Sequence, residues 1–166
     1  ICRFDADDVM KPGYLAQQIQ LFSAHADVTA TWSIYTDEQL QPTSFVPAHK
    51  VRYPSSGENP KAVDGQFMVK KHVFEQLGGF QPWRIGADTD LHNRIRCAGF
   101  KHGVVEDFLY FRRTHLTSLI AHPSTNFDSP KRKAVQQLTA EYAQCYQTGE
   151  RPLYVQPECH PSYVEF

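Results

Sequence analysis

The chain has 166 residues, of which 41% are hydrophobic and 13% aromatic, and this size and composition are typical of one globular domain. Its 17 Lys and Arg residues against 18 Asp and Glu residues give a formal charge of -1, without the basic excess that binds a nucleic-acid backbone. No apolar run approaches the roughly 20 residues of a membrane-spanning helix. These properties, with four widely spaced cysteines, predict a cytoplasmic protein that is either free or peripheral at the inner face of a membrane.

The first residues predict the last half of a strand that ends in a cluster of carboxylates. Ile1 and Phe4 form a short apolar stub, and Asp5, Asp7 and Asp8 follow directly. Like charges this close together favour a divalent cation or a shared proton. The alternative is that Asp7 and Asp8 only cap the next helix and face water.

The following residues predict a helix, a strand and a loop. Residues 13–24 predict a helix, because Pro12 suits a first turn and apolar residues recur at helical spacing. Residues 28–35 alternate between apolar and polar types, which is the period of a half-buried strand. Prolines and glycine between residues 41 and 59 predict a surface loop with one short strand around Phe45.

The middle of the chain predicts two helices that end at glycines. Residues 70–77 predict a helix that Gly78 ends in the left-handed conformation. Residues 89–98 predict a second helix, for which Asp88 or Thr89 is the expected cap.

The last third of the chain predicts a strand, a helix and a tail. Residues 104–111 are β-branched and aromatic, which favours a strand, and His115 follows it. Ser129 and Pro130 form a cap and first turn for a helix over residues 130–147. Prolines after residue 150 predict an extended tail.

Asp88 is a second candidate for chemistry. A carboxylate at the start of a helix, beside the flexible Gly86, can be aimed into a cleft and can accept a proton from a hydroxyl group. The alternative is that Asp88 and Asp90 only satisfy the helix dipole as acids of the first turn.

Three motifs together resemble a known enzyme family. They are Phe4-Asp5-Ala6-Asp7-Asp8, the stretch from Gly65 to Val69 that runs into Phe74-Glu75-Gln76-Leu77-Gly78-Gly79-Phe80, and the stretch from Gly86 to Arg94. In order and spacing they resemble the second half of a family 2 glycosyltransferase of the GT-A fold, over about Ile1 to Ile120. The resemblance implies an α/β fold, a nucleotide-diphospho-sugar transferase with a mixed sheet flanked by helices. Residues 1–123 would form the metal and acceptor side of its core, and residues 124–166 a C-terminal helix and tail.

The resemblance also implies a metal site and a donor. The family's Asp-x-Asp motif carries over to Asp5 and Asp7, which would hold Mn²⁺ or Mg²⁺ on the two phosphates of a nucleotide-sugar such as a UDP-sugar. Asp7 would be the direct ligand and Asp8 a close neighbour. The chain is also similar to the galactosyltransferase branch, whose third metal ligand is a His after the last core strand, and His115 takes that place. As a lone residue, His115 would otherwise be an ordinary surface histidine.

The family's Glu-Asp motif reads Ala87-Asp88 in this chain, so the Glu is absent and Asp88 is the expected base of an inverting transfer. Gly65, Trp83 and Asp90 are the expected acceptor-binding residues, for a glycan or glycoconjugate acceptor in polysaccharide or glycoconjugate synthesis. Three aromatic residues are candidates for stacking on sugar faces, with a place in the core as the favoured alternative for each: Trp83, Phe67 and Tyr110.

Three other hypotheses stay open. The nucleotide-binding first half of the family is expected before Ile1. The chain would then be a fragment of a longer enzyme, a remnant domain, or a chain whose sheet is completed by another copy through self-association. A truncated domain could bind a sugar chain or a partner without catalysis. The opening Asp-x-Asp-x-Val also matches haloacid-dehalogenase-type phosphohydrolases, with Asp5 as nucleophile and Asp7 as acid.

Overall fold

The computed structural model describes residues 1–47 and 65–155. The chain divides into two compact units. The first unit comprises Ile1–Lys70 and Lys101–Ala121, and the second comprises Lys71–Phe100 and His122–Phe166. The predicted loop residues 48–59 and most of the predicted tail lie outside the described residues.

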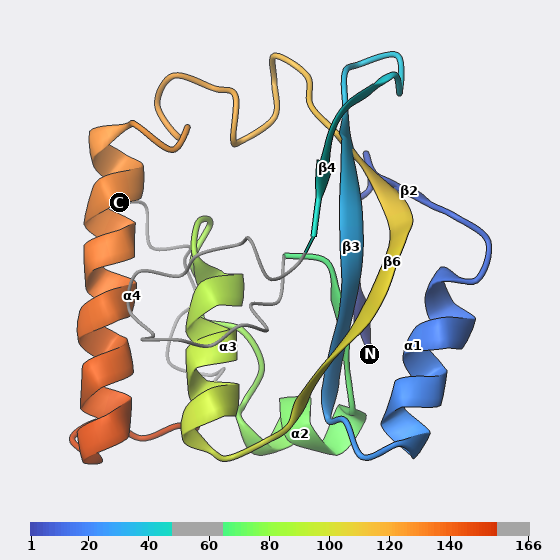
Figure 1. The fold of residues 1–166 in the computed structure, drawn as a ribbon. Helices are drawn as coiled ribbons and strands as arrows, with labels where there is room; N and C mark the ends of the chain where they lie inside the picture. The colour runs from blue at the N-terminus through green and yellow to red at the C-terminus, as the bar shows by residue number, and fades with distance from the viewer. Residues whose placement is uncertain (48–64, 156–166) are drawn as a thin grey trace. The chain divides into compact units, whose positions relative to one another are not determined.

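The first unit contains a mixed six-stranded sheet (Figure 1). Its strands are β1 (Cys2–Arg3), β2 (Val9–Met10), β3 (Val28–Thr36), β4 (Pro42–Val46), β5 (Phe67–Val69) and β6 (His102–Arg113). The strand order is β1-β5-β3-β6-β2, with β4 also paired to β3. Of the pairings among the described residues, only that of β3 with β6 is parallel. The sheet and the helices together confirm the predicted α/β class.

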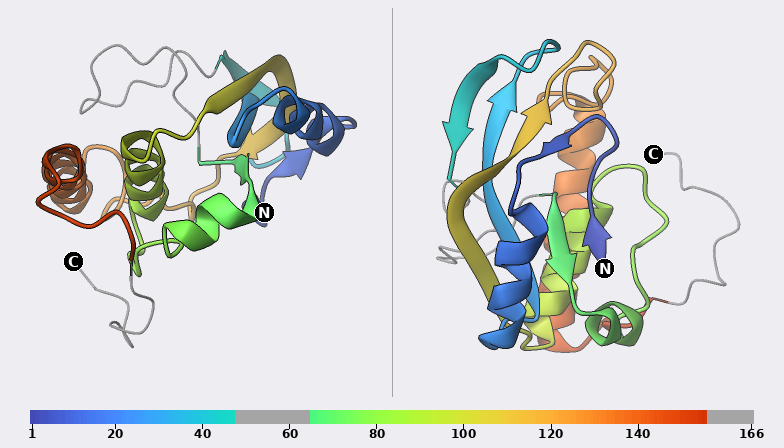
Figure 2. Two further views of the ribbon diagram at one scale, coloured as in Figure 1. Left: turned by 90° about the horizontal axis from the view of Figure 1, so that it is seen from below. Right: turned by 90° about the vertical axis from the view of Figure 1, so that its right-hand side faces the viewer.

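Helix α1 (Tyr14–Ser23) packs on β3 and β6, as Figure 2 shows. The predicted helix is confirmed, but the apolar spacing did not identify its buried face. Tyr14 and Gln18 are buried, whereas Leu15 is 43% and Ile19 is 52% exposed. The buried Gln18 amide donates to the Tyr14 carbonyl at 3.1 Å and accepts from Thr29 Oγ1 at 3.2 Å. These two bonds offset the cost of burying the amide.

Aromatic rings form the core between α1 and the sheet. The rings of Phe4, Tyr14 and Tyr110 contact one another edge to face, with centroids 5.3 to 6.0 Å apart. Tyr110 and Phe67 are both 0% exposed. Neither ring offers a face to a ligand, so the favoured alternative, a place in the core, is confirmed for these two residues and sugar stacking is excluded for them.

The second unit contains three helices: α2 (Lys71–Gln76), α3 (Ala87–Cys97) and α4 (Pro130–Thr148). Helices α3 and α4 lie side by side (Figure 1). The predicted start of α4 is confirmed, since Ser129 Oγ accepts the Arg132 N–H at 3.1 Å. No helix within residues 1–47 and 65–155 has the length and apolar character needed to cross a membrane.

Two predicted helix boundaries are corrected. Helix α2 begins at Lys71, because Val69 completes strand β5, which the sequence did not predict. Helix α3 begins two residues early, at Ala87, and its cap is Gly86 with a φ of 79°, not the side chain of Asp88 or Thr89. A Cβ on Gly86 would lie 2.7 Å from Val135 Cγ1, so both the backbone conformation and the packing require glycine.

Candidate functional site

The three clustered aspartates lie in the loop that connects β1 to β2. Because these strands stand at opposite ends of the strand order, the loop joins the two sides of the sheet (Figure 2). The antiparallel register of β2 on β6 pairs Val9 with Phe111. This register brings Asp8 beside Arg113, whose backbone N–H donates to Asp8 Oδ1 at 2.9 Å. The acidic loop therefore lies against the end of β6.

Gln66 holds two of the three carboxylates. Its Nε2 donates to Asp5 Oδ2 and to Asp8 Oδ2, each at 2.7 Å, and its Oε1 accepts the Asp5 N–H at 3.0 Å. The residue is only 1% exposed. Each polar atom of the amide is thus used within the loop. The sequence reasoning missed Gln66, whose only signal was its place directly before the apolar stretch of β5.

The remaining contacts of Asp5 and Asp8 balance part of their charge. Arg3 pairs with Asp5 Oδ1 at 3.0 Å and also donates to the carbonyl of Gly65, an expected acceptor residue. Burial raises the pKa of Asp8 to about 6, although the Arg113 N–H and the Arg112 charge oppose this rise. The cluster therefore favours a bound proton at mildly acidic pH, and a nearby cation would favour the ionised form.

Asp7 meets His115, although 108 positions separate the two residues in the sequence. His115 Nε2 lies 2.8 Å from Asp7 Oδ2, and the Asp7 side chain is 42% exposed. The other ring nitrogen, Nδ1, lies 2.8 Å from Thr117 Oγ1. The His115 backbone N–H donates to Ser118 Oγ at 3.1 Å. Contacts at both nitrogens fix the ring, and Asp7 can be reached from solvent.

The donor atoms of this pair suit a hard divalent cation. Two donors on adjacent positions of an octahedral ion with bonds of about 2.1 Å lie about 3 Å apart, and the separation of Asp7 Oδ2 and His115 Nε2 is 2.8 Å. Carboxylate oxygen is a ligand that Mg²⁺ and Mn²⁺ prefer. Across residues 1–47 and 65–155, however, no group of three or more His, Cys, Asp or Glu side chains could hold a metal ion. Asp7 and His115 are therefore two donors, and any further ligands of a cation would come from outside the described residues.

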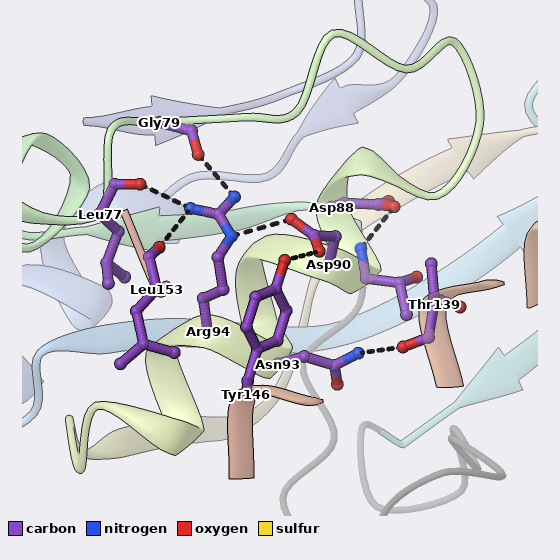
Figure 3. Close-up of polar contacts among 10 residues, drawn as sticks. Leu77, Gly79, Asp88, Asp90, Asn93, Arg94, Thr139, Tyr146 and Leu153 are labelled. Atoms are coloured by element: carbon purple, nitrogen blue, oxygen red, sulfur yellow. Dashed lines mark hydrogen bonds and ion pairs between the residues drawn. The ribbon is translucent and has the colours of Figure 1, made fainter. Parts of the chain in front are cut away.

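Asp90, the expected acceptor residue of the second unit, is a structural residue (Figure 3). It is 0% exposed, its Oδ2 accepts from Arg94 Nε at 2.8 Å, and its Oδ1 accepts from the Tyr146 hydroxyl at 2.8 Å. Burial is the larger cause and the negative charge of Asp90 the second cause that raise the pKa of Tyr146 to about 12. A carboxylate without exposed surface does not fit a role in binding an acceptor.

Arg94 connects three segments of the second unit (Figure 3). It is 0% exposed and donates to the carbonyls of Leu77 and Gly79, each at 2.7 Å, and of Leu153 at 3.5 Å. These carbonyls lie after α2 and after α4. The sequence reasoning missed this role, although the spacing of four residues between Asp90 and Arg94 on a helix was visible.

The residues after α4 return to the end of α2. The Val155 N–H donates to the Leu77 carbonyl at 3.0 Å. A Cβ on Gly78 would lie 1.9 Å from the Val155 carbonyl oxygen. The contact therefore requires glycine at position 78, which also has the left-handed φ of 71° that the sequence predicted.

Asp88 stands at the solvent side of the first turn of α3. It is partly exposed, and its Oδ1 accepts the Thr89 N–H at 2.8 Å. Its Oδ2 has no partner within the part of the chain that the structure describes. Trp83, an expected acceptor residue, is also partly exposed, and its ring lies 5.4 Å from that of Tyr142. Asp88 therefore has one carboxylate oxygen available to accept a proton.

No family model matches the chain, and no curated protein matches it significantly.

Proposed function

We propose that the chain is part of a metal-dependent, inverting glycosyltransferase of the GT-A fold. It would transfer a sugar from a nucleoside diphosphate donor to an acceptor hydroxyl. The observation that carries this proposal is the 2.8 Å contact between Asp7 and His115. The resemblance to family 2 glycosyltransferases and their galactosyltransferase branch assigns these two residues to one cation. The mixed sheet of the first unit is compatible with that fold.

In the proposed mechanism, Asp7 and His115 would hold Mn²⁺ or Mg²⁺. The cation would supply positive charge that stabilises the departing nucleoside diphosphate. Gln66 keeps Asp5 and Asp8 in place, so that the acidic loop retains its shape.

The resemblance assigns the removal of the proton of the attacking hydroxyl to Asp88, whose available oxygen could accept it. Trp83 contributes the exposed part of its ring as an apolar surface for a sugar. The proposed partners are a UDP-sugar and a glycan or glycoconjugate. Self-association through the sheet stays part of the proposal, because β1 pairs only with β5 and ends the strand order.

A sugar- or partner-binding domain without catalysis is the second candidate function. The phosphohydrolase hypothesis has less support. Its proposed nucleophile, Asp5, is already bound by Arg3 and Gln66. The successive strand–helix units of that family would also give parallel strands, whereas among the described residues only β3 and β6 pair in parallel.

Titration calorimetry with Mn²⁺ and UDP tests the proposal. We expect weak binding of Mn²⁺ alone and tighter binding with UDP, because the diphosphate supplies ligands that the protein lacks. Asp7→Asn should weaken Mn²⁺ binding in the presence of UDP by about tenfold or more, since a charged ligand is lost. Asp107→Asn is the matched control, because Asp107 is an exposed acid on β6, and it should bind as the wild type does.

Two results would contradict the proposal. One is the absence of heat in the wild type with Mn²⁺ and UDP together. The other is an Asp7→Asn variant that binds as tightly as the Asp107→Asn variant. Binding of a glycan without any dependence on Mn²⁺ or UDP would instead favour the non-catalytic domain.

A further inference from the structure

His115 has a second hydrogen-bonding partner on the side of its ring away from Asp7. Thr117 Oγ1 lies 2.8 Å from Nδ1, while Asp7 Oδ2 lies 2.8 Å from Nε2. The turn that places the hydroxyl is itself held, since the Ser118 N–H donates to the His115 carbonyl at 2.9 Å. A carboxylate, an imidazole and a hydroxyl therefore form one chain of contacts.

The Thr117 hydroxyl suits both neutral forms of the ring. An ionised Asp7 can only accept, so in the metal-free pair the ring proton is on Nε2 and Nδ1 accepts from the hydroxyl. A cation bound to Nε2 needs the lone pair of that nitrogen, so the single proton of the neutral ring must be on Nδ1. There it is donated to Thr117 Oγ1, because a hydroxyl can either donate or accept. For a neutral ring, cation binding at Nε2 therefore requires the proton on Nδ1 instead of on Nε2.

We propose that Thr117 is a positioning residue for the cation site. Its hydroxyl orients the His115 ring toward Asp7 and stabilises the tautomer that leaves Nε2 free to bind the cation. This inference rests on the proposed function, because it assigns His115 as a ligand. It adds a residue that neither the motifs nor the resemblance indicated.

The chain contains a similar contact that serves as an internal comparison. His122 Nδ1 lies 2.8 Å from Ser124 Oγ, with the same separation of two residues. Within the described residues, no carboxylate contacts His122. The contact between a histidine and a hydroxyl two residues later is therefore a local turn feature, and the acid partner distinguishes His115.

The test compares Thr117→Val, which keeps the shape but loses the hydroxyl, with Thr117→Ser, which keeps the hydroxyl. Mn²⁺ affinity in the presence of UDP should fall about 3- to 10-fold in Thr117→Val, as expected for one lost hydrogen bond. Thr117→Ser should bind within about twofold of the wild type, and Ser124→Ala should bind as the wild type does. Nitrogen NMR shifts of the wild-type His115 ring should show Nε2–H without metal, and Nδ1–H with Mg²⁺ and UDP.

Different results separate this inference from the proposed function. Equal Mn²⁺ affinity of Thr117→Val and the wild type would overturn the inference alone. An equal loss in Thr117→Ser and Thr117→Val would also overturn it, because the hydroxyl would then be irrelevant. A wild-type ring that keeps its proton on Nε2 with Mg²⁺ and UDP would overturn both, because that nitrogen could then not bind the cation. Absence of Mn²⁺ binding by the wild type would overturn both.

Discussion

Replacing Arg94 with methionine should lower the free energy of unfolding by about 3–5 kcal/mol. Among the described residues, the change leaves the buried Asp90 carboxylate with the Tyr146 hydroxyl as its side-chain partner. It also removes one donor from each of the carbonyls of Leu77 and Gly79. Urea denaturation of the full chain measures the effect. The loss in an Asp90→Asn and Arg94→Met double variant should be smaller than the sum of the two single losses, because the buried charge is then removed as well.

Arg96→Met is the matched control for this prediction. Arg96 lies on the same helix and is partly exposed, and one of its contacts is with Asn93. Its replacement should cost less than about 1 kcal/mol. Equal losses at positions 94 and 96 would contradict the role of Arg94 as the buried connection between α3 and the segments after α2 and α4.

Asp88→Asn should lower turnover about 10²-fold or more, because the asparagine amide cannot accept the proton of an attacking hydroxyl. Binding of UDP with Mn²⁺ should stay unchanged, since Asp88 is not a ligand of the proposed cation. Mn²⁺-dependent release of UDP from a UDP-sugar measures the turnover, with water or a glycan as acceptor. Asp128→Asn, a change at an exposed acid, is the control and should keep full turnover.

Asp90→Asn provides the contrast to Asp88→Asn. Because Asp90 is buried with Arg94 and Tyr146, its replacement should lower stability more than Asp88→Asn does. If Asp88→Asn kept full turnover while folded Asp90→Asn lost it, the base would be Asp90. If neither variant changed turnover, the proposed mechanism would fail.

The parts of the fold that the sequence predicted carry local signals. Helix α4 begins after the Ser129 cap and is followed by Gly149 in the left-handed conformation. The sequence predicted both of these helix ends, because serine before proline and a glycine after the last turn are typical of them. Strand β5 was missed, because three residues are too few to show a period of two. The buried face of α1 was not identified, because the polar Gln18 is buried through its bonds to Tyr14 and Thr29.

The residues of the candidate site also differ in whether the sequence carried a local signal for them. The aspartates of the acidic loop stand within four positions, at the end of an apolar strand, so their spacing was informative. Gln66 was missed, because its bonds reach Asp5 and Asp8 over 61 and 58 positions and a single glutamine has no pattern. Asp90 was assigned to the acceptor side, because burial by α4 cannot be read from two acids in one first turn.

The central claim is that Asp7 and His115 hold the cation that carries the nucleoside diphosphate. Electron spin-echo spectroscopy of Mn²⁺ bound with UDP tests it most directly, because a ligating imidazole nitrogen modulates the echo. We predict nitrogen modulation in the wild type and in His122→Gln, and none in His115→Gln. Mn²⁺ that binds the wild-type protein with UDP but shows no nitrogen modulation would contradict the claim.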